Sequence, residues 1–468
     1  MTLIFVGRAQ ELSRLRKEFS LARPSLLVVY GRRRIGKSAL LKEAAKDRPH
    51  VLYQATRVTP TLNLEGFKAE IARSLGADPL LDGLGDWLSV LTYLARKAEG
   101  TLGLIVVLDE FPYLVEGDQA LPSIIQKFWD AVVGAEGKLN LVLCGSMIAQ
   151  MEDLLAERNS LYGRQTLPLE VKALPLRDAA GFFPDYPAVD RILAYAIFSG
   201  IPFYLRLCDP SASLEENVTN LLLADTGAVV DEPNVLLQSE LRETQRYASI
   251  LAAIADGCTK LGEIGGRLRD IKDSVSLSPY MKRLERMRLV RTVHSLDANP
   301  KSRDTRYFVD DPLVAFWHRF VRPNMSSVMQ GFGPEIWRHQ VVPRLDEYMG
   351  GAFEEICRGH ARRHAQEALP SPAQEIGQIW GAEYDIDVAG RLLDGSMLYG
   401  ECKWRRGMIG ADVLATLIER AGRTDYGRGV EDRHFVLYAR TGFKAGVQER
   451  AKEDGRIVLL TPDTMLAL

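Results

Sequence analysis

Short apolar runs separated by longer amphipathic stretches mark the first third of the chain. Near-continuous apolar runs are typical of parallel strands that are buried on both faces, and the stretches between them have the spacing of helices. We therefore expect a parallel sheet covered by helices over residues 1–172. The expected strands are residues 26–30, 51–54, 102–108, 139–144 and 167–171.

The pattern changes after residue 172. Residues 173–240 have helical spacing throughout and predict a helical lid. Residues 245–310 predict three helices followed by a hairpin. Beyond Pro323 the pattern predicts a long helix and then strands. These elements are expected at residues 343–365, 384–393, 397–404 and 434–440.

Composition narrows the class of protein. The chain has 468 residues, a hydrophobic fraction of 46% and a formal net charge of −2, so any nucleic-acid surface must be local. The sequence contains no run of about 18 apolar residues, so no membrane span is expected. The N-terminus lacks the apolar core of a signal peptide. The five cysteines have no CxxC spacing, so neither a zinc site nor a disulfide framework follows. We expect a cytoplasmic protein with no membrane partner.

The strongest chemical signal is a glycine-rich loop between a predicted strand and a predicted helix. Its residues match GxxxxGK[ST] at every fixed position: Gly31-Arg32-Arg33-Arg34-Ile35-Gly36-Lys37-Ser38. Glycines let main-chain amides curl around phosphate oxygens, and the helix N-terminus adds partial positive charge. We expect Lys37 to reach the β- and γ-phosphates of ATP, Ser38 to bind Mg²⁺, and Ala39 to belong to the same nucleotide-binding turn.

An acidic pair follows another apolar strand. Residues 104–108 are LIVVL, and Asp109 and Glu110 come directly after them. Asp109 is predicted to hold Mg²⁺ through water, and Glu110 to act as the base that orients the attacking water. The next expected strand ends in Ser146. This serine is placed either to sense the γ-phosphate or to act as an ordinary N-cap of the following helix.

Several short motifs resemble the archaeal-type P-loop ATPase family, which is related to AAA+ and STAND proteins. They are Phe5-Val6-Gly7-Arg8 with Glu11, Leu108-Asp109-Glu110-Phe111, Gly145-Ser146, Leu161-Tyr162-Gly163-Arg164 and Ser199-Gly200-Ile201-Pro202. The family usually has glycine at the position that Ser199 occupies in this chain.

The resemblance implies roles for residues outside the loop. Val6, Gly7 and Arg8 would line the adenine pocket, and Pro202 would contact the nucleotide from the helical lid. Arg164 would be an arginine finger or sensor, acting within the chain or across a subunit interface of a homo-oligomer. The alternative for Arg164 is an ordinary ion-paired surface arginine.

Residues 245–310 resemble a winged helix-turn-helix. The third expected helix, residues 276–288, has an apolar stripe and a basic outer side. The stripe is Leu277, Met281, Leu284 and Met287, and the basic residues are Lys282, Arg283, Arg286 and Arg288. The expected hairpin tip, residues 297–304, carries Lys301 and Arg303. Such a unit can place a helix in the major groove of DNA and its wing on the backbone. The alternative is a lid or a protein contact.

A third candidate site lies near the C-terminus. Asp387 is followed by Glu401 and Lys403, which resembles the D…ExK arrangement of PD-(D/E)xK nucleases. Residues two apart in a strand share a face, so Glu401 and Lys403 point the same way. Carboxylates held close together bind Mg²⁺, and a lysine beside them polarises the attacking water. By the same resemblance Glu354, on the upstream helix, would complete the metal site. Arg405 and Arg406 lie beside this site in the sequence and are candidates to bind phosphates.

The turn between the two strands decides whether these groups meet. A two-residue turn would pair Asp387 with Cys402 and leave it on the opposite face from Glu401. A three-residue loop, 393–395, pairs Asp387 with Glu401 and has Gly395 in the left-handed region. We predict the three-residue loop. The alternatives are a hairpin with solvated charges and a nuclease fold retained without cleavage.

Together the patterns predict an α/β protein with four parts: a P-loop NTPase parallel sheet, a helical lid, a winged helix-turn-helix domain and a C-terminal α/β restriction-endonuclease-like domain. The expected boundaries are 1–172, 173–240, 241–323 and 324–468. We expect ATP and Mg²⁺ as cofactors and DNA as the partner, with Mg²⁺-dependent nuclease action in the last domain. The alternative is a STAND-like nucleotide-controlled switch whose last domain only binds a partner.

Overall fold

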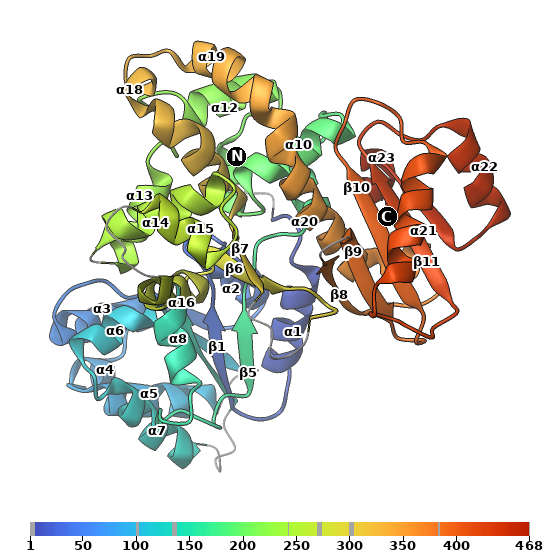
Figure 1. Ribbon diagram of the computed structural model, residues 1–468. Coiled ribbons are helices and arrows are strands. Elements are labelled where there is room, and N and C mark those ends of the chain that lie inside the picture. The colour runs from blue at the N-terminus through green and yellow to red at the C-terminus, as the bar shows by residue number, and fades with distance from the viewer. Residues whose placement is uncertain are drawn as a thin grey trace. The chain divides into compact units, whose positions relative to one another are not determined.

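The chain folds into two compact units, shown in the computed structural model of Figure 1. The first unit is Met1–Ala173 together with Ile201–Phe203, and the second is Leu174–Gly200 together with Tyr204–Leu468. The structure describes residues 5–99, 103–132, 138–241, 243–268, 274–298, 304–381 and 384–467.

A five-stranded parallel sheet forms the centre of the first unit, in the order β2-β3-β4-β1-β5. Each strand lies on one of the five apolar runs, so the expected parallel sheet is confirmed. Strands β3 and β4 are buried at every position, as a sheet covered on both faces requires. The strands are β1 Ser25–Tyr30, β2 His50–Gln54, β3 Leu104–Asp109, β4 Leu139–Gly145 and β5 Leu167–Glu170.

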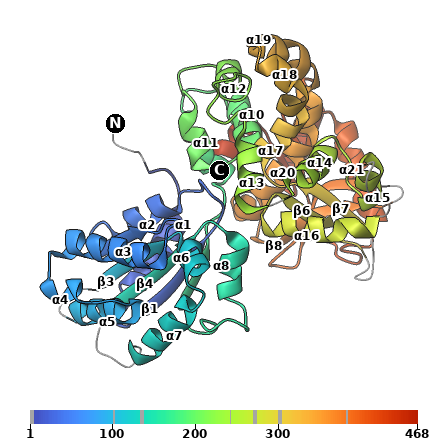
Figure 2. The ribbon, with the colours of Figure 1, turned by 90° about the vertical axis from the view of Figure 1, so that its left-hand side faces the viewer.

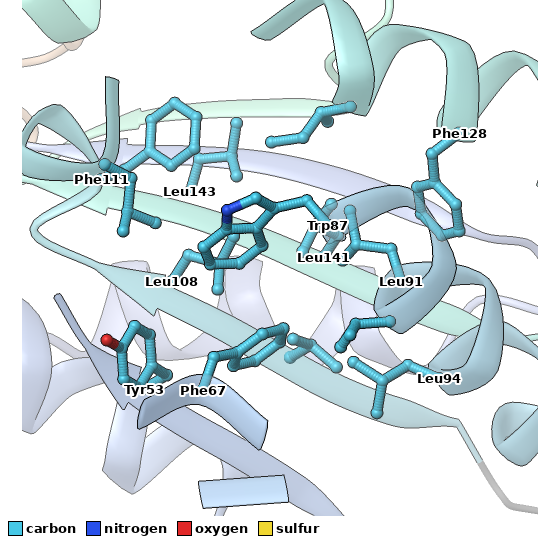
Figure 3. Packing of buried hydrophobic residues seen from close by; sticks show 14 of the residues in the cluster. Tyr53, Phe67, Trp87, Leu91, Leu94, Leu108, Phe111, Phe128, Leu141 and Leu143 are labelled. Carbon is cyan, nitrogen blue, oxygen red and sulfur yellow. The ribbon is translucent and has the colours of Figure 1, made fainter. Parts of the chain in front are cut away.

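Helices cover both faces of this sheet (Figure 2). They are α1 Ala9–Phe19, α2 Lys37–Ala45, α3 Pro60–Leu75, α4 Pro79–Asp82, α5 Trp87–Ala98, α6 Phe111–Gly117, α7 Leu121–Val132 and α8 Ile148–Leu154. On one face Phe67 of α3 stacks on Trp87 of α5, with ring centroids 5.3 Å apart, in the same cluster as Leu108 of β3 (Figure 3). Thr59 and Asp86 accept main-chain amides at the starts of α3 and α5, so caps and the shared core fix both helices.

The second unit begins with helices, of which α10 reaches the C-terminal part of the chain. They are α9 Leu176–Ala180, α10 Ala188–Phe198, α11 Pro202–Leu207, α12 Leu214–Leu222 and α13 Glu232–Glu240; the first residues of α11 belong to the first unit. Ile192 and Ala196 of α10 lie in one hydrophobic cluster with Phe353 of α20 (Val342–Ala368).

Three helices and a hairpin follow, in the order expected from the sequence. They are α14 Thr244–Ala255, α15 Leu261–Arg267, α16 Ser278–Arg286, β6 Val290–His294 and β7 Thr305–Val309. The expected stripe of Leu277, Met281, Leu284 and Met287 is buried. Of the four basic residues expected on the outer side, Lys282 is exposed and Arg283, Arg286 and Arg288 are partly buried. Lys301 and Arg303 lie outside the described residues.

Short helical segments join the hairpin to α20. They are α17 Pro312–Phe316, α18 Met325–Val328, α19 Gly333–Ile336 and two π-helical segments, Trp317–Val321 and Trp337–Val341. Phe316, Trp317 and Phe320 are fully buried, and Trp317 Nε1 donates to the carbonyl of Val230 at 2.6 Å. These aromatic side chains pack the joint.

A mixed five-stranded sheet forms the C-terminal part, in the order β12-β11-β10-β9-β8. Strands β8, β9 and β10 are antiparallel, whereas β10, β11 and β12 are parallel. Helix α20 packs on one face and α21 on the other (Figure 1). The elements are β8 Ala373–Trp380, β9 Asp385–Leu392, β10 Met397–Lys403, α21 Ala411–Arg423, β11 Arg433–Ala439, α22 Ala445–Glu453, β12 Ile457–Leu460 and α23 Pro462–Ala467. Strands β9, β10 and β11 were expected from the sequence, whereas β8 and β12 were not.

Over the part of the chain that the structure describes, no helix combines the length and the apolar character that crossing a bilayer requires.

Candidate functional site

The glycine-rich loop lies between β1 and α2, as the motif requires. Gly31 has φ 154°, and a Cβ there would lie 2.3 Å from the carbonyl oxygen of Val171, so only glycine fits. Gly36 precedes α2 in the left-handed region, with φ 93°. These two turns curl the main chain at the N-terminus of α2, where amides and the helix dipole attract phosphate.

Lys37 spans the inside of this loop. Its Nζ donates to the carbonyl oxygens of Gly31 and Arg32, at 3.0 and 3.1 Å, and its side chain is buried. Ser38 and Ala39 beside it are exposed, so the first turn of α2 is open to solvent. An ammonium group inside the loop is placed to neutralise a phosphate that the loop's amides surround.

Ser38 and Asp109 bring two oxygen ligands together from different elements. Ser38 Oγ, in the first turn of α2, donates to Asp109 Oδ2 at the end of β3. Asp109 Oδ1 accepts the main-chain amide of Glu110 at 3.0 Å. Neighbouring hydroxyl and carboxylate oxygens are the hard ligands that Mg²⁺ prefers, so the residues present fit the predicted ion.

Ser146 holds the carboxylate of Glu110. Its Oγ lies 3.0 and 2.8 Å from the two carboxylate oxygens, and its main-chain nitrogen is 3.3 Å from Oε2. Glu110 has φ 53°, a conformation that non-glycine residues rarely adopt. Helix α8 begins at Ile148 with Met147 as its N-cap, so the N-cap alternative for Ser146 is wrong.

The N-terminal segment contacts the same loop. Arg8 is buried, and its guanidinium donates to the carbonyl oxygen of Ile35 at 3.1 Å and to Glu11 at 2.9 Å. Gly7 and Arg8 have φ 70° and 64°, so the chain turns sharply before α1 begins. The segment that contains Val6 is therefore anchored beside the loop; its contact with adenine stays a prediction.

Ile201–Phe203 return to the first unit and meet the loop. A Cβ added at Gly36 would lie 3.8 Å from Pro202 Cγ. The guanidinium of Arg34 lies over the Phe203 ring, 4.3 Å from its centroid, whereas Arg33 is exposed. Pro202 therefore lies beside the phosphate-binding turn, and its contact with nucleotide stays a prediction.

The departure from the usual glycine at Ser199 has a structural cost. Ser199 is buried with φ 65° and ψ −177°, a region that glycine alone adopts without strain. At the next position a Cβ would lie 2.0 Å from the carbonyl oxygen of Leu174, so Gly200 has no substitute. The Ser-Gly pair thus holds a tight turn at the end of α10.

Arg164 forms a bidentate ion pair instead of standing free. Its Nε and Nη2 donate to the two carboxylate oxygens of Asp130, at 2.7 and 3.0 Å, and Nη1 donates to the carbonyl of Ser160 at 3.0 Å. This hydrogen bonding lowers the pKa of Asp130. The geometry favours the surface ion pair, and the arginine-finger role stays a prediction.

The hairpin in the C-terminal sheet has the predicted turn. Leu392 donates to Ser396 across a three-residue loop, and Gly395 has φ 90°. The paired residues of the two strands run from Met397↔Arg391 to Gly400↔Val388. Continuing this register by one residue would place Asp387 opposite Glu401. The predicted loop and register are confirmed over these pairs.

The register was expected to bring the side chains of Asp387 and Glu401 to one face, but a β-bulge at Asp387 changes the direction of its side chain. Gln378 of β8 faces both Asp387 and Val388 of β9. Ile386 and Ala389 pack in the same cluster although they are an odd number of positions apart, so the alternation of side chains breaks between them. The carboxylate of Asp387 turns to accept the amide of Cys402 at 2.8 Å.

Glu401 and Lys403 do share a face, as predicted. Glu401 is buried, and its Oε1 accepts from Lys403 Nζ at 2.5 Å, while Arg420 of α21 lies 3.5 Å away. Burial, followed by repulsion from Glu354 and Glu401, raises the pKa of Asp387 to about 7. Burial also raises the pKa of Glu354. Carboxylates that disfavour one another's ionisation form a site where a cation would relieve repulsion.

The expected three-carboxylate metal centre is nevertheless not formed. Among the described residues, no three His, Cys, Asp or Glu side chains are placed to hold a metal ion. The cause is local: the bulge turns Asp387 to the Cys402 amide, and Lys403 already pairs with Glu401. Glu354 projects from α20, on the other side of the sheet from α21. The donor chemistry fits Mg²⁺, and the three-ligand site of Glu354, Asp387 and Glu401, which these side-chain orientations do not preform, stays a prediction.

The strand order, the phosphate-binding loop and the acidic pair at the end of β3 define a P-loop ATPase. Two parts of the chain also match known families. Residues 5–207 match an ATPase domain found predominantly in Archaea, and residues 317–414 match a family of archaeal and bacterial proteins of unknown function.

One relative and two solved structures are similar to this chain over most of its length. The uncharacterized protein MJECL04 of Methanocaldococcus jannaschii is 29% identical over 407 residues, which is 86% of this chain and 88% of that protein. The Walker-type ATPase PABY2304 of Pyrococcus abyssi is 22% identical, with a TM-score of 0.52 over 67% of this chain and 96% of that one, which shows a shared fold. The Aeropyrum pernix ORC2 protein, solved as ADPNP–ADP complexes, is 14% identical with a TM-score of 0.45, over 73% of this chain and 97% of that one.

Proposed function

We propose that ATP hydrolysis in the first unit drives or licenses action on DNA by the second unit. We infer a helical lid at 173–240, a winged helix-turn-helix at 241–323 and a nuclease-like domain at 324–468. The helix, three antiparallel strands, helix and parallel strand from α20 to β11 support the last assignment, because they resemble the restriction-endonuclease-like fold. The observation that carries the proposal is the Glu401–Lys403 pair beside Asp387 at one end of β9 and β10.

The ATPase site divides the work among five side chains. Lys37 would bind the β- and γ-phosphates, and Ser38 with Asp109 would hold Mg²⁺, which would supply positive charge to the phosphates. Glu110 orients the attacking water and accepts its proton. Ser146 keeps that carboxylate in one orientation, because its hydroxyl and amide both reach it.

The candidate site in the second unit is suited to phosphodiester chemistry. A bound Mg²⁺ would supply a Lewis acid for the phosphate. Lys403 would position water beside Glu401, and Asp387 would supply a second carboxylate. Arg405 and Arg406, both exposed directly after β10, offer contacts to backbone phosphates.

The test is a binding and cleavage assay on the full chain. Linear, supercoiled, branched and single-stranded DNA are offered with Mg²⁺ or Mn²⁺, with and without ATP. Lys403→Ala and Asp387→Ala are compared with Lys444→Ala, an exposed lysine outside the cluster. We expect cleavage that is lost in the first two variants and kept in the third. Tight DNA binding without cleavage would leave an ATPase with a nuclease fold that no longer cuts.

A nucleotide-controlled switch is the second candidate. It is favoured by the packing of hairpin β6–β7 on the C-terminal sheet, where Ser295 and Leu296 bond to β8. A hairpin used in this way is not a free wing for DNA. Nucleotide-dependent self-association without salt-dependent DNA affinity would favour the switch, and Arg164 would then be tested as a group acting across the homo-oligomer interface.

A further inference from the structure

The bulge at Asp387 is held in place from two directions. Gln378 of β8 faces both Asp387 and Val388, so the regular ladder is interrupted there. The carbonyl oxygen of Asp387 accepts from Arg358 Nη1 at 2.8 Å. On the edge of the sheet, the carbonyl oxygen of Gln378 accepts the main-chain amide of Leu296 at 3.0 Å. Both strands of the bulge therefore bond to groups outside the sheet.

Arg358 is the centre of the first set of contacts. It projects from α20, is only 3% exposed, and donates Nε to Glu355 at 3.0 Å. Its Nη1 also lies 3.7 Å from the carboxylate of Glu354. A buried guanidinium with several fixed partners holds one orientation, and the loss of one partner is costly. Arg358 thus ties the main chain at Asp387 to α20.

Hairpin β6–β7 supplies the second set of contacts. Arg291 of β6 lies 2.9 Å from the carboxylate of Glu355, the residue that also binds Arg358. Ser295 Oγ accepts the amide of Trp380 at 2.9 Å, and Trp380 Nε1 donates to Asp304 at 2.7 Å. The hairpin therefore fastens the edge strand β8 next to the bulge and also reaches Arg358 through one shared carboxylate.

We propose that Arg358 is a positioning residue for the Asp387 carboxylate, and that hairpin β6–β7 regulates the C-terminal site through it. This inference rests on the proposed function for what the site does, whereas the contacts of Arg358 and of the hairpin are independent of that function. Arg291 and Arg358 share the carboxylate of Glu355. Release of Arg291 would leave Glu355 less firmly held. Arg358 would then hold the main chain at Asp387 less rigidly. The hairpin of the middle segment thereby becomes part of the site that it adjoins.

The experiment compares two arginines of α20, Arg358 and Arg362, with Arg291 of β6. Arg358→Met, Arg358→Lys and Arg291→Met are made in the full chain, with Arg362→Met as the matched control. Arg362 lies one turn further along α20 and also pairs with Glu355, but it is 45% exposed and does not bond to Asp387. ATPase rate and thermal unfolding check that each variant folds. Arg358→Lys keeps the charge without the planar fork, so it is informative if Arg358→Met does not fold.

Two readouts decide the inference. The first is Mn²⁺ affinity by calorimetry, where we expect Arg358→Met to lose about 10- to 100-fold and Arg291→Met to lose less. The loss should be smallest in Arg362→Met, whose exposed guanidinium reaches Glu355 but not Asp387, and Asp387→Asn should show no further loss when Arg358→Met is added. The second is hydrogen exchange at the Cys402 amide, which donates to Asp387. We expect faster exchange in Arg358→Met and Arg358→Lys than in Arg362→Met.

The outcomes separate this inference from the proposed function. Equal effects of Arg358→Met and Arg362→Met on both readouts would overturn the positioning role. A wild-type protein that binds no Mn²⁺ would remove the proposed cleavage site, and the exchange at Cys402 would then decide alone: faster exchange in the Arg358 variants supports the positioning role, and unchanged exchange overturns it.

Discussion

The ATPase site and the carboxylate group of the second unit hold their charges differently. In the ATPase site a contiguous loop supplies the main-chain turns, Lys37 bonds to a carbonyl oxygen of that loop, and Ser38 bonds to Asp109. In the second unit Asp387 is held by a backbone amide and Glu401 by Lys403, so the carboxylates do not form one ligand set. A phosphate-binding loop carries its geometry in local sequence, whereas a carboxylate site depends on partners from several elements.

The largest expected effect is at the ATPase site. Lys37→Ala should abolish ATP turnover, because the cation inside the loop is lost. Glu110→Gln should keep nucleotide binding and slow hydrolysis by about 10²- to 10⁴-fold, the usual contribution of a general base. Steady-state phosphate release and nucleotide affinity are the measurements.

Glu116→Gln is the control for Glu110, because Glu116 lies exposed on the adjacent α6 and pairs only loosely, at 3.6 Å, with Arg57. Hydrolysis by Glu110→Gln at the wild-type rate would show that another group activates the water.

The second-largest expected effect is a pH dependence of the stability of the second unit, which contains Asp387. The pKa of Asp387 is raised from 3.8 to about 7, chiefly by burial. The folded protein therefore keeps this proton while the unfolded chain loses it, so the contribution to stability is lost as pH rises from about 4 to about 7. Asp387→Asn should gain stability relative to wild type between pH 5 and pH 7.5 by on the order of 2 kcal/mol.

Denaturant unfolding of the second unit at several pH values measures this gain. Asp394→Asn, in the loop of the same hairpin, is the control, because hydrogen bonds from Ser396 lower the pKa of Asp394 instead of raising it. A pH-independent difference between Asp387→Asn and wild type would contradict the buried, protonated carboxyl.

A smaller effect concerns the strained turn at the end of α10. Ser199→Gly should raise the free energy of unfolding by about 1 kcal/mol, because glycine adopts this conformation without strain but has more freedom when unfolded. Ser199→Ala should give no gain, since it keeps the Cβ. Equal stability of the two variants in thermal unfolding would show that the backbone at Ser199 carries no strain.

The smallest effect is expected at the ion pair of the first unit. Arg164→Ala and Asp130→Ala should each lower stability by at most about 1 kcal/mol, as a surface pair does. Both should keep the ATPase rate. A fall in ATPase rate of about 10³-fold in Arg164→Ala but not in Asp130→Ala would instead establish the arginine finger.

Local sequence predicted the first unit better than the second for a physical reason. The glycine-rich loop, the strand before it and Asp109 are read from short contiguous runs, and a parallel sheet buries those runs on both faces. The hairpin loop around Gly395 was also predicted, because loop length fixes register. Strands β8 and β12 were missed, since β8 alternates weakly and contains Gly377, and β12 has four residues.

The rest of the candidate site depends on contacts that no local pattern contains. Arg358 bonds to a carbonyl 29 positions away, and Trp380 bonds to a serine 85 positions away. The bulge at Asp387 arises from how β8 meets β9, which the sequence of β9 does not specify. At position 199 the sequence shows only a serine where the resembled family usually has glycine. The positive φ of Ser199 in the structure explains why glycine suits this position.

The three-residue loop between β9 and β10 also constrains how the chain can diverge. If the three-residue loop is kept, insertion or deletion of one residue in this hairpin would move every side chain of one strand to the other face, while a change of two residues would restore the original parity. Descendants of this sequence that keep the C-terminal site should therefore vary the length of this hairpin in even steps. Odd steps should appear only in lineages that have lost the site or have gained a compensating residue within β9 or β10.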